Sequence, residues 1–465
     1  MRVAVVGGGL SGLVAARHLV AADHRVTVLE AGPRLGGKVA AARLGDLMLD
    51  AGAESMLARV PEGQRPEVVE LLTDLGCEIV GPEPAGAQLY VDGAVRPMPR
   101  SMVGVPFRAA DLAEILTPEG LQRAEREPDL PAPPRTTDLA IGALVDERFG
   151  PEVTDRLLEP MLGGVYAGHA RELSTAAVAP TLWERIRNGG ALTIDAPPAG
   201  PDRREAPRSP LVGTPGGLHT VVDRLVADLA ERGASVRTKA TVRALRRTTA
   251  GWDLTVGPTI APETVTADAL VLATGAAPTA RLLDGLLPRS VTDDLATVRY
   301  ASVAVLSVLA TGLDITGSGL LVPPGELPTI KAFTHSSRKW RWVRDRLDAT
   351  HGPDHEVVRI SIGRAGAAAQ LQLPDDALVA RTLSEAATAP GWADARVQQW
   401  HLQRWGGALP QYEVGHRGRV AHWRAALDAV PDLAVCGALW DGVGLAACLR
   451  SARDAAETII ESTHT

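Results

Sequence analysis

Three glycines near the start of the chain have the spacing of a turn that binds phosphate. They read Gly7-x-Gly9-x-x-Gly12, and Glu30 follows eighteen residues after the last of them. Glycines let the backbone turn tightly and let its amides approach a pyrophosphate, while an acid at this distance can accept hydrogen bonds from a ribose. The motif therefore predicts a dinucleotide site, formed by Gly7, Gly8, Gly9, Leu10, Ser11, Gly12 and Glu30.

The residues around the glycines must form the elements that position them. Residues 2–6 (RVAVV) are long enough for a buried strand and too short for a helix, and residues 25–29 (RVTVL) repeat that pattern. Between them Leu13, Val14 and Val20 follow helical spacing. A strand, a glycine turn, a helix and a second strand within thirty residues predict a βαβ unit.

The segment after Glu30 distinguishes between classes of dinucleotide. Residues 30–38 (EAGPRLGGK) resemble the E-x-x-x-R-x-G-G signature of the glutathione-reductase-type FAD proteins, with a plain glycine hinge as the alternative. The resemblance implies FAD, and its phosphate charge would be met by Arg34 or Lys38. Residues 50–55 (DAGAES) resemble the segment beside the isoalloxazine ring. The implied contacts are Ala31, Arg34, Gly37, Lys38, Gly52, Ala53, Glu54 and Ser55.

Three later segments resemble the remaining parts of such a site. Val242, in the strand after residues 239–241 (KAT), stands at the place where FAD proteins contact adenine through the backbone, although an isolated valine is more often part of a core. Residues 273–275 (ATG) match a second fingerprint near the cofactor. Residues 436–445 (CGALWDGVGL) resemble the turn that closes over the flavin, which adds Val443, Gly444 and Leu445.

A narrower resemblance covers nearly the whole chain. Residues 164–168 (GVYAG), followed by Leu173-Ser174, resemble the G-V-Y-A-G-D-x-x-x-L-S segment of the protoporphyrinogen and coproporphyrinogen oxidases. Residues 404–416 (RWGGALPQYEVGH), which include Trp405, resemble that family's R-W-x-x-A-x-P-Q-Y-x-x-G-H. Thr334, Ser336, Lys339 and Trp340 match another of its motifs. His169 and Ala53 depart from the family, which usually has Asp and commonly has Pro at these places.

The resemblance implies oxidation of a porphyrinogen to a porphyrin by non-covalently bound FAD. Six electrons would leave in three two-electron steps and dioxygen would take them as peroxide, so we expect flavin-centred chemistry with no catalytic side chain and no metal. Coproporphyrinogen III, with four propionates, is favoured over protoporphyrinogen IX, with two. Because arginine suits carboxylates, the expected substrate contacts are Arg59 and Arg171, together with Tyr166 of the GVYAG motif.

Two other functions remain open. A flavin amine oxidase would share the fold and the FAD motifs, and Trp440 and Lys331 would supply its aromatic residue and its lysine near the flavin. A flavin-containing carrier would hand porphyrin to a chelatase without oxidising it, and turnover with release of peroxide would exclude it. An oxidase of this pathway would itself contact a ferrochelatase transiently.

Composition narrows the class of protein. The 465 residues are 45% hydrophobic and 22% charged with a net charge of −7, which is typical of a globular chain and argues against nucleic acid as the main partner. The longest run without a charged side chain, residues 3–16, is shorter than a membrane span and precedes no convincing signal-peptide cleavage site. Three cysteines without paired spacing fit a reducing compartment. We therefore expect a cytoplasmic protein with no membrane span.

Further patterns along the chain indicate where the other elements lie. Residues 218–229 have the spacing of one buried helix face, and residues 300–310 and 356–362 are β-branched and apolar, which suits a second sheet. The charged, proline-rich residues 196–210 predict a surface loop.

These patterns together predict an α/β fold with three parts. The first is a Rossmann-like FAD-binding domain of the glutathione-reductase and amine-oxidase type, the second a mixed β-sheet substrate-binding domain, and the third a small helical insertion, with the active site at their junction. Their expected residues are 1–75, 212–290 and 405–465 for the FAD-binding domain, 76–100, 165–211 and 291–404 for the substrate-binding domain, and 101–164 for the insertion.

Overall fold

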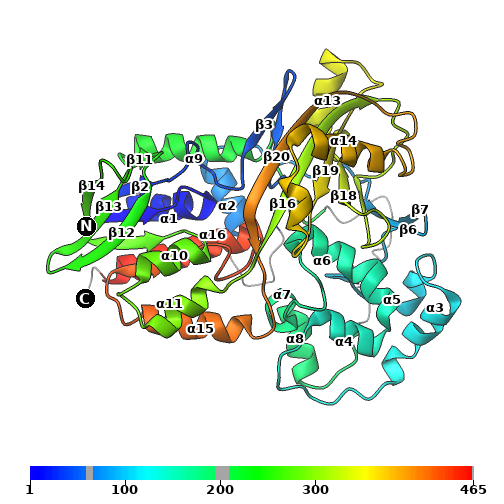
Figure 1. Cartoon of the computed structure of the whole chain (residues 1–465), viewed down its shortest axis with the longest axis horizontal. Coiled ribbons are helices and arrows are strands. Elements are labelled where there is room, and N and C mark those ends of the chain that lie inside the picture. The colour runs from blue at the N-terminus through cyan, green and yellow to red at the C-terminus, as the bar shows by residue number, and fades with distance from the viewer. Residues whose placement is uncertain (59–65, 194–208, 463–465) are drawn as a thin grey trace.

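The computed structural model describes residues 1–58, 66–193 and 209–462, and it contains two main β-sheets and a group of helices (Figure 1). Both termini lie at the end of the molecule that holds a parallel sheet. A seven-stranded sheet lies beside that part, and the helices between residues 118 and 187 form a third part below the seven-stranded sheet in this view. This is the α/β fold that the sequence predicts.

The parallel sheet carries the predicted βαβ unit. Its strands are β1 (Arg2–Val6), β2 (Arg25–Leu29), β11 (Ser235–Arg237), β15 (Ala269–Leu272) and β21 (Leu433–Val435). They lie in the order β11-β2-β1-β15-β21, and Val3 pairs with Val26 on one side and Ala269 on the other. The strand order reverses direction between β1 and β15. In such sheets the ligand binds at this switch point, beyond the carboxyl ends of the strands.

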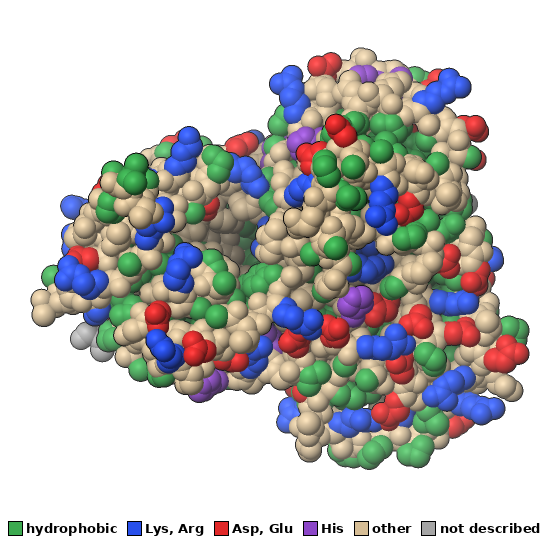
Figure 2. Space-filling model, viewed as in Figure 1, with side chains coloured by type: hydrophobic (Ala, Val, Ile, Leu, Met, Phe, Trp, Pro, Cys, Tyr) green, Lys and Arg blue, Asp and Glu red, His purple; other side chains and the backbone are tan. Residues whose placement is uncertain are grey.

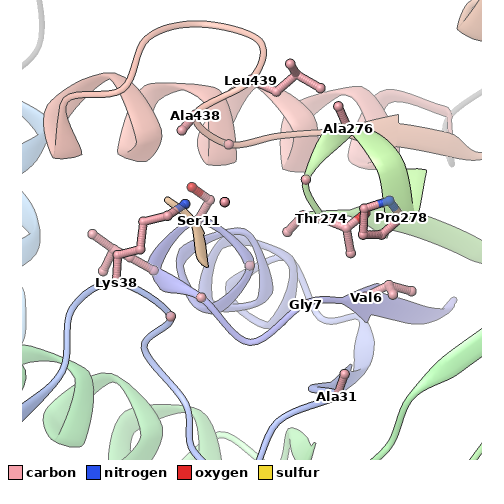
Figure 3. Close-up of a pocket in the computed structure, with 18 of the residues that line it drawn as sticks. Val6, Gly7, Ser11, Ala31, Lys38, Thr274, Ala276, Pro278, Ala438 and Leu439 are labelled. Carbon is pink, nitrogen blue, oxygen red and sulfur yellow. The ribbon is translucent and has the colours of Figure 1, made fainter. Parts of the chain in front are cut away.

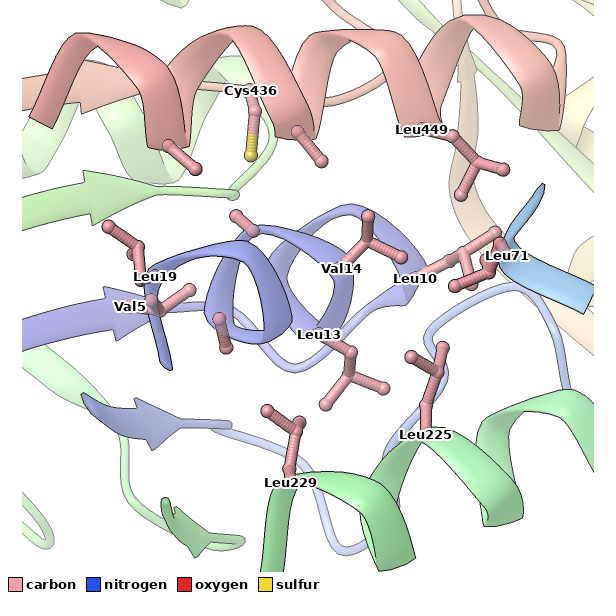
Figure 4. Packing of buried hydrophobic residues seen from close by; sticks show 14 of the residues in the cluster. Val5, Leu10, Leu13, Val14, Leu19, Leu71, Leu225, Leu229, Cys436 and Leu449 are labelled. Carbon is pink, nitrogen blue, oxygen red and sulfur yellow. The ribbon is translucent and has the colours of Figure 1, made fainter. Parts of the chain in front are cut away.

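Four helices cover one face of the parallel sheet: α1 (Leu10–Ala21), α2 (Glu67–Asp74), α9 (His219–Glu231) and α16 (Leu445–Ser462). Helix α1 lies between α9 and α16, with Leu13 facing Leu225 and Leu229 of α9 (Figure 4). The predicted helix face in residues 218–229 is confirmed, because Val221 and Val222 are buried with these leucines. Each such side chain contributes about 1.5–3 kcal/mol when buried, so this packing fixes the glycine turn at the start of α1.

The opposite face of the parallel sheet is covered by a small antiparallel sheet and three helices. Trp252 and Trp423 are fully buried in the core between them. The elements are β12 (Val242–Thr248), β13 (Gly251–Val256), β14 (Glu263–Ala267), α10 (Ala276–Leu283), α11 (Arg289–Ala296) and α15 (His416–Leu427).

The second main sheet has seven strands in the order β20-β16-β19-β18-β17-β6-β7, of which only the β17–β6 pair is parallel. The predicted strands at residues 300–310 and 356–362 are confirmed. The strands are β6 (Ala87–Val91), β7 (Ala94–Pro97), β16 (Tyr300–Thr311), β17 (Gly319–Leu321), β18 (Ile330–His335), β19 (Glu356–Ile362) and β20 (Arg396–Pro410). Around this sheet lie β3 (Ala41–Leu44), β4 (Leu47–Asp50), α12 (Ser336–Lys339), α13 (Arg341–Thr350) and α14 (Asp375–Ala386).

The third part consists of short helices that share one core, which includes Phe149 and Tyr166. The helices are α3 (Pro118–Glu125), α4 (Ile141–Arg148), α5 (Pro151–Val153), α6 (Glu159–Tyr166), α7 (Thr175–Val178) and α8 (Pro180–Arg187). Because α7 and α8 pack into the same core, we propose that the helical insertion extends beyond residue 164. Short strand pairs complete the chain: β5 (Met56–Leu57) with β10 (Leu211–Val212), and β8 (Ser101–Met102) with β9 (Val105–Pro106).

Two expectations concern the surface. The predicted proline-rich loop at residues 196–210 lies almost wholly outside the described residues. Across the parts of the chain that are described, every helix is too short or too polar to pass through a bilayer.

Candidate functional site

A cavity of about 750 Å³ opens at the switch point of the parallel sheet. Its walls come from the segments that follow β1, β2, β15 and β21, together with residues 405–410 at the end of β20 (Figure 3). On the face shown in Figure 2 the surface is hollowed between the lobe with the parallel sheet and the lobe with the seven-stranded sheet. The cavity therefore lies where the fold predicts a dinucleotide and at the junction of two parts of the molecule.

The glycine turn has no room for side chains on its packed side. A Cβ on Gly12 would lie 1.9 Å from the carbonyl oxygen of Gly7, and one on Gly7, whose φ is +110°, would lie 2.7 Å from the carbonyl oxygen of Ala273. Gly9 is different, because a Cβ there meets nothing closer than 3.8 Å. The turn thus holds the start of α1 against β1 and β15 while leaving the backbone at Gly9 open to the cavity.

The start of α1 is suited to an anion. Gly9 is the N-cap residue and provides no side chain, and the first turn contains no acidic residue. The first backbone amides of a helix have no partner within the helix and carry partial positive charge, so this end favours a phosphate group. These are the residues of the sequence-predicted turn, and Gly7, Gly9, Leu10, Ser11 and Gly12 all line the cavity.

Glu30 joins the loop after β2 to the glycine turn. Its carboxylate accepts hydrogen bonds from the backbone amides of Gly8, at 2.7 Å, and Gly32, at 2.6 Å. Gly8 itself is not a lining residue, and its amide acts by holding this carboxylate. Glu30 and Ala31 line the cavity, and each carboxylate oxygen retains a lone pair for a ribose hydroxyl.

Two cations border the cavity. Arg34 donates to the carbonyl oxygen of Gly37 at 2.7 Å, and its guanidinium carbon lies 5.1 Å from the centre of the Trp405 ring. Lys38 extends into the open space beside Ser11 (Figure 3). Because the surrounding protein removes water from Lys38, the pKa of its ammonium group is lowered. A bound phosphate would reverse that effect by supplying the opposite charge.

Residues 50–55, the segment expected beside the flavin ring, are held in place by contacts with Lys38, Arg359 and Trp405. A Cβ on Gly52 would lie 2.0 Å from the carbonyl oxygen of Lys38, and Arg359 donates to the carbonyl oxygen of Gly52 at 2.5 Å. The indole of Trp405 donates to the carbonyl oxygen of Ala51 at 3.1 Å. Gly52, Ala53, Glu54 and Ser55 do not line the cavity, so the structure does not bring their side chains to it.

Glu54 belongs instead to a buried ionic network. Its carboxylate accepts from Ser336 at 2.7 Å and from Lys339 at 3.0 Å, and it lies 3.3 Å from a guanidinium nitrogen of Arg359. Burial alone would raise the pKa of Glu54, but the two cations outweigh that effect and hold it at about 2. The sequence motif that contains Thr334, Ser336 and Lys339 therefore serves this network, which ties residues 50–55 to the seven-stranded sheet.

The later segments reach the cavity largely as the resemblance implies. Val242, Trp405, Val443 and Leu445 line it, as do residues 273–275, whereas Gly444 does not. Sequence reasoning missed Tyr300, whose hydroxyl accepts from the amide of Ala276 at 2.9 Å. A tyrosine at the start of a predicted strand carries no local signal for such a role. Other lining residues that the sequence did not assign to the cofactor include Val6, Pro278, Arg281, Leu282, Cys448 and residues 406–410.

The three expected substrate contacts lie in different surroundings. Arg59 is outside the described residues. Tyr166 is buried beside Tyr412, with ring centres 5.7 Å apart, and burial raises the pKa of its hydroxyl to about 12. Arg171 forms ion pairs with Asp146, at 2.7 Å, and Asp155, at 2.6 Å, so its charge is already compensated. Neither Tyr166 nor Arg171 lines the cavity.

Cysteine and metal chemistry have little support in the described residues. Cys77, Cys436 and Cys448 are free, and burial raises the pKa of each thiol. Thiols with raised pKa values are poor nucleophiles near neutral pH. Within the described ranges, no three His, Cys, Asp or Glu side chains are grouped to hold a metal ion.

Comparison with known proteins identifies the family. Residues 10–460 match the family described as flavin containing amine oxidoreductase. The coproporphyrinogen III oxidase of Mycobacterium tuberculosis strain H37Rv is 34% identical over 473 residues, which cover 98% of this chain and 97% of that protein. The coproporphyrinogen III oxidase of Bacillus subtilis is 26% identical, covering 96% and 95%.

Two solved structures support the same conclusion about the fold. A protein from Exiguobacterium sp. 255-15, solved as a candidate protoporphyrinogen oxidase, has a TM-score of 0.83 and 26% identity, covering 99% of this chain and 98% of that one. Cyclohexylamine oxidase from Brevibacterium oxydans has a TM-score of 0.68 and 16% identity, covering 100% and 99%, so it shares the fold. The chain therefore belongs to the flavin-containing amine oxidoreductase family.

Proposed function

We propose that this protein oxidises coproporphyrinogen III to coproporphyrin III with non-covalently bound FAD and dioxygen, in haem biosynthesis. The observation that carries the proposal is full-length similarity, at 34–35% identity, to mycobacterial coproporphyrinogen III oxidases, in a chain whose cavity is lined by a dinucleotide-binding turn. The three free cysteines fit a reducing compartment, and we propose the cytoplasm.

The residues present fit FAD rather than a smaller ligand. The closely packed glycine turn and the free amides of α1 would receive the pyrophosphate, with Lys38 adding a positive charge. Glu30 would hold the adenosine ribose, and the backbone near Val242 would lie against adenine. Residues 405–410 and 436–445 would enclose the ring end. We propose Gly37, Gly52, Ala53, Ser55, Val443, Gly444 and Leu445 as further residues that contact or shape the flavin site.

When bound, the flavin supplies two-electron oxidation of the macrocycle and passes the electrons to dioxygen. The protein's own residues bind, orient and exclude water. Trp405 and the apolar residues 408–410, at the end of β20, form the wall of the cavity that the seven-stranded sheet provides. The overall change is the loss of six electrons and six protons from the porphyrinogen, and three dioxygen molecules take them up as three hydrogen peroxide molecules.

Aerobic turnover tests the proposal directly. The purified yellow protein is mixed in parallel with coproporphyrinogen III and protoporphyrinogen IX, while porphyrin fluorescence and peroxide are followed together. We expect faster oxidation of coproporphyrinogen III and about three peroxides per porphyrin. A bound flavin with neither porphyrinogen oxidised would contradict the proposal. Faster oxidation of protoporphyrinogen IX would make that compound, and not coproporphyrinogen III, the assigned substrate.

The amine oxidase alternative has weaker support in the structure. Trp440 packs edge-on against Trp423 in the core, with ring centres 6.0 Å apart, and does not line the cavity. Amine oxidases among the solved structures are about 16% identical to this chain, which supports a common fold and no more. Transient transfer of the porphyrin to a ferrochelatase stays a prediction.

Lys38→Met is expected to weaken FAD binding about tenfold or more, because a charge-assisted hydrogen bond to phosphate contributes about 1.5–3 kcal/mol. The dissociation constant is measured by titrating flavin-depleted protein with FAD and following flavin fluorescence. Lys239→Met is the matched control, since Lys239 is an exposed lysine that does not line the cavity. Equal affinities for the two variants would remove Lys38 from the proposed site.

A further inference from the structure

Two cations, the buried Lys331 and the half-buried Arg364, approach the same turn of helix α6 from the seven-stranded sheet. The ammonium nitrogen of Lys331, in β18, lies 3.3 Å from the carbonyl oxygen of Gly163. Arg364, just after β19, packs so closely that a Cβ on Gly163 would lie 2.4 Å from its Nη1 atom. Lys331 is only 6% exposed. The two cations therefore share one small region between the sheet and the helical part.

Neither cation is in direct ion-pair contact with a carboxylate among the described residues, and Glu159 acts on Arg364 at longer range. Arg364 donates through Nη2 to the carbonyl oxygen of Val322 at 2.8 Å, but its Nη1 atom is buried with no hydrogen-bond partner. No described carboxylate forms an ion pair with Arg364 or Lys331. Burial and the nearby Arg364 charge lower the pKa of Lys331 to about 7.

Other buried cations in the protein are compensated. Arg148 pairs with Glu127 at 2.6 Å, and Arg359 pairs with Glu54 at 3.3 Å. Lys331 and the buried Nη1 atom of Arg364 bring two like charges together without a direct anionic partner, which is unfavourable. An anion bound between them would offset that cost.

Glu159, the acid that acts on Arg364, does not complete the site. Glu159, at the start of α6, accepts from the amide of Ala170 at 2.8 Å, and its second oxygen lies 3.9 Å from His169 without a hydrogen bond. Burial raises the pKa of Glu159. Glu159 and His169 are the other titratable groups that face this region from the helical part.

The region adjoins the flavin cavity through a layer of small residues. The amide of Ala365, next to Arg364, donates to the carbonyl oxygen of Ala167 at 2.6 Å. Ala167 and Ala365 pack with Ala408, and Ala408 and Trp405 line the cavity. This packing places the region next to the cavity wall at Ala408, although neither Lys331 nor Arg364 lines the cavity.

We propose that Lys331 and Arg364 form a binding site for one carboxylate of the substrate, an inference that rests on the proposed function. The carboxylate would accept hydrogen bonds from Nζ of Lys331 and from the unpartnered Nη1 of Arg364. The carbonyl oxygen of Gly163 does not need the hydrogen bond from Lys331, because it already accepts one from the amide of Ala167 at 3.1 Å.

Lys331→Met tests the site in the flavin-loaded enzyme, because methionine keeps the length of the side chain and removes its charge. Binding of coproporphyrin III is followed by its fluorescence. The tetramethyl ester of coproporphyrin III, which has no free carboxylate, is measured in parallel in dilute detergent. We expect about tenfold weaker binding of the free acid, unchanged binding of the ester, and a rise in KM for coproporphyrinogen III with little change in kcat. Arg341→Met, which removes an exposed charge on α13, should change none of these.

A second measurement separates binding from a structural role. Lys331→Met removes a buried charge. The melting temperature of the variant without ligand should therefore be roughly 2–4 °C higher than that of the wild type at pH 6. The folded pKa of about 7 lies below the unfolded value, so the penalty is full below pH 7 and decreases as pH rises from there. The gain should therefore shrink by pH 9.

The outcomes distinguish the two proposals. A wild-type protein that oxidises neither porphyrinogen would contradict the proposed function, and the binding of coproporphyrin III would still test the site. A Lys331→Met variant that binds acid and ester as the wild type does would overturn the site. So would a variant that melts at a lower temperature and loses acid and ester equally, because Lys331 would then serve the packing of α6.

Discussion

Gly12→Ala is expected to yield protein with almost no bound flavin and a markedly lower stability. A Cβ at this position would lie 1.9 Å from the carbonyl oxygen of Gly7 and 3.2 Å from the Cβ of Ala273. The first contact is with backbone, so it is relieved only if α1 moves away from β1. That movement would disturb the core between α1, α9 and α16 and displace the amides that face the cavity.

Gly9→Ala is the matched control, because the two glycines share one turn and differ in their surroundings. At Gly9 φ is −73°, which alanine adopts without strain, and the nearest atom to a Cβ is 3.8 Å away. We expect this variant to fold normally and to bind FAD more weakly, since its methyl group would face the cavity. Flavin absorbance per protein and thermal unfolding of both variants measure these effects. A Gly12→Ala protein with the flavin content of the wild type would contradict the assignment of the turn.

Glu54→Ala is expected to lower the free energy of unfolding by about 3–5 kcal/mol, the usual effect of removing one partner from a buried ion pair. Lys339 and Arg359 would remain buried without their counter-ion, and Arg359 would no longer be held where it donates to Gly52. Denaturant unfolding of the flavin-loaded protein measures the loss. Asp345→Ala, in the exposed pair with Arg341, should change stability by less than about 0.5 kcal/mol.

The Glu54 network also gives a pH dependence. The pKa of Glu54 is lowered from 4.5 to about 2 in the folded protein, so the carboxylate contributes stability that is fully present above pH 4.5 and is lost as pH falls towards 2. The shift corresponds to about 3 kcal/mol. Glu54→Gln should lack this component of acid unfolding while keeping the hydrogen bond with Ser336. Identical acid unfolding of Glu54→Gln and the wild type would show that the network contributes little.

Much of the fold follows from patterns that lie close together in the chain. The βαβ unit at residues 2–29, the buried face of α9 and the strands at residues 300–310 and 356–362 each depend on spacing within a few turns or strand positions, so the sequence predicts them. The glycine turn and Glu30 belong to the same class, because their roles are set by a local backbone shape. The extent of the helical part stays a prediction, since α7 and α8 join its core only by packing.

The sequence by itself determined the cofactor class and the family, through short motifs whose geometry is local. Tertiary structure alone decided which charges meet. Glu54 stands in a motif typical of flavin contact but is paired with Lys339 and Arg359, which are about 300 positions away. Arg171 is already paired, whereas the buried Lys331 and the half-buried Arg364 have no direct carboxylate partner in the described part of the chain. The physical reason is that the pairing and desolvation of a charge depend on neighbours brought together by folding, which no local spacing reveals.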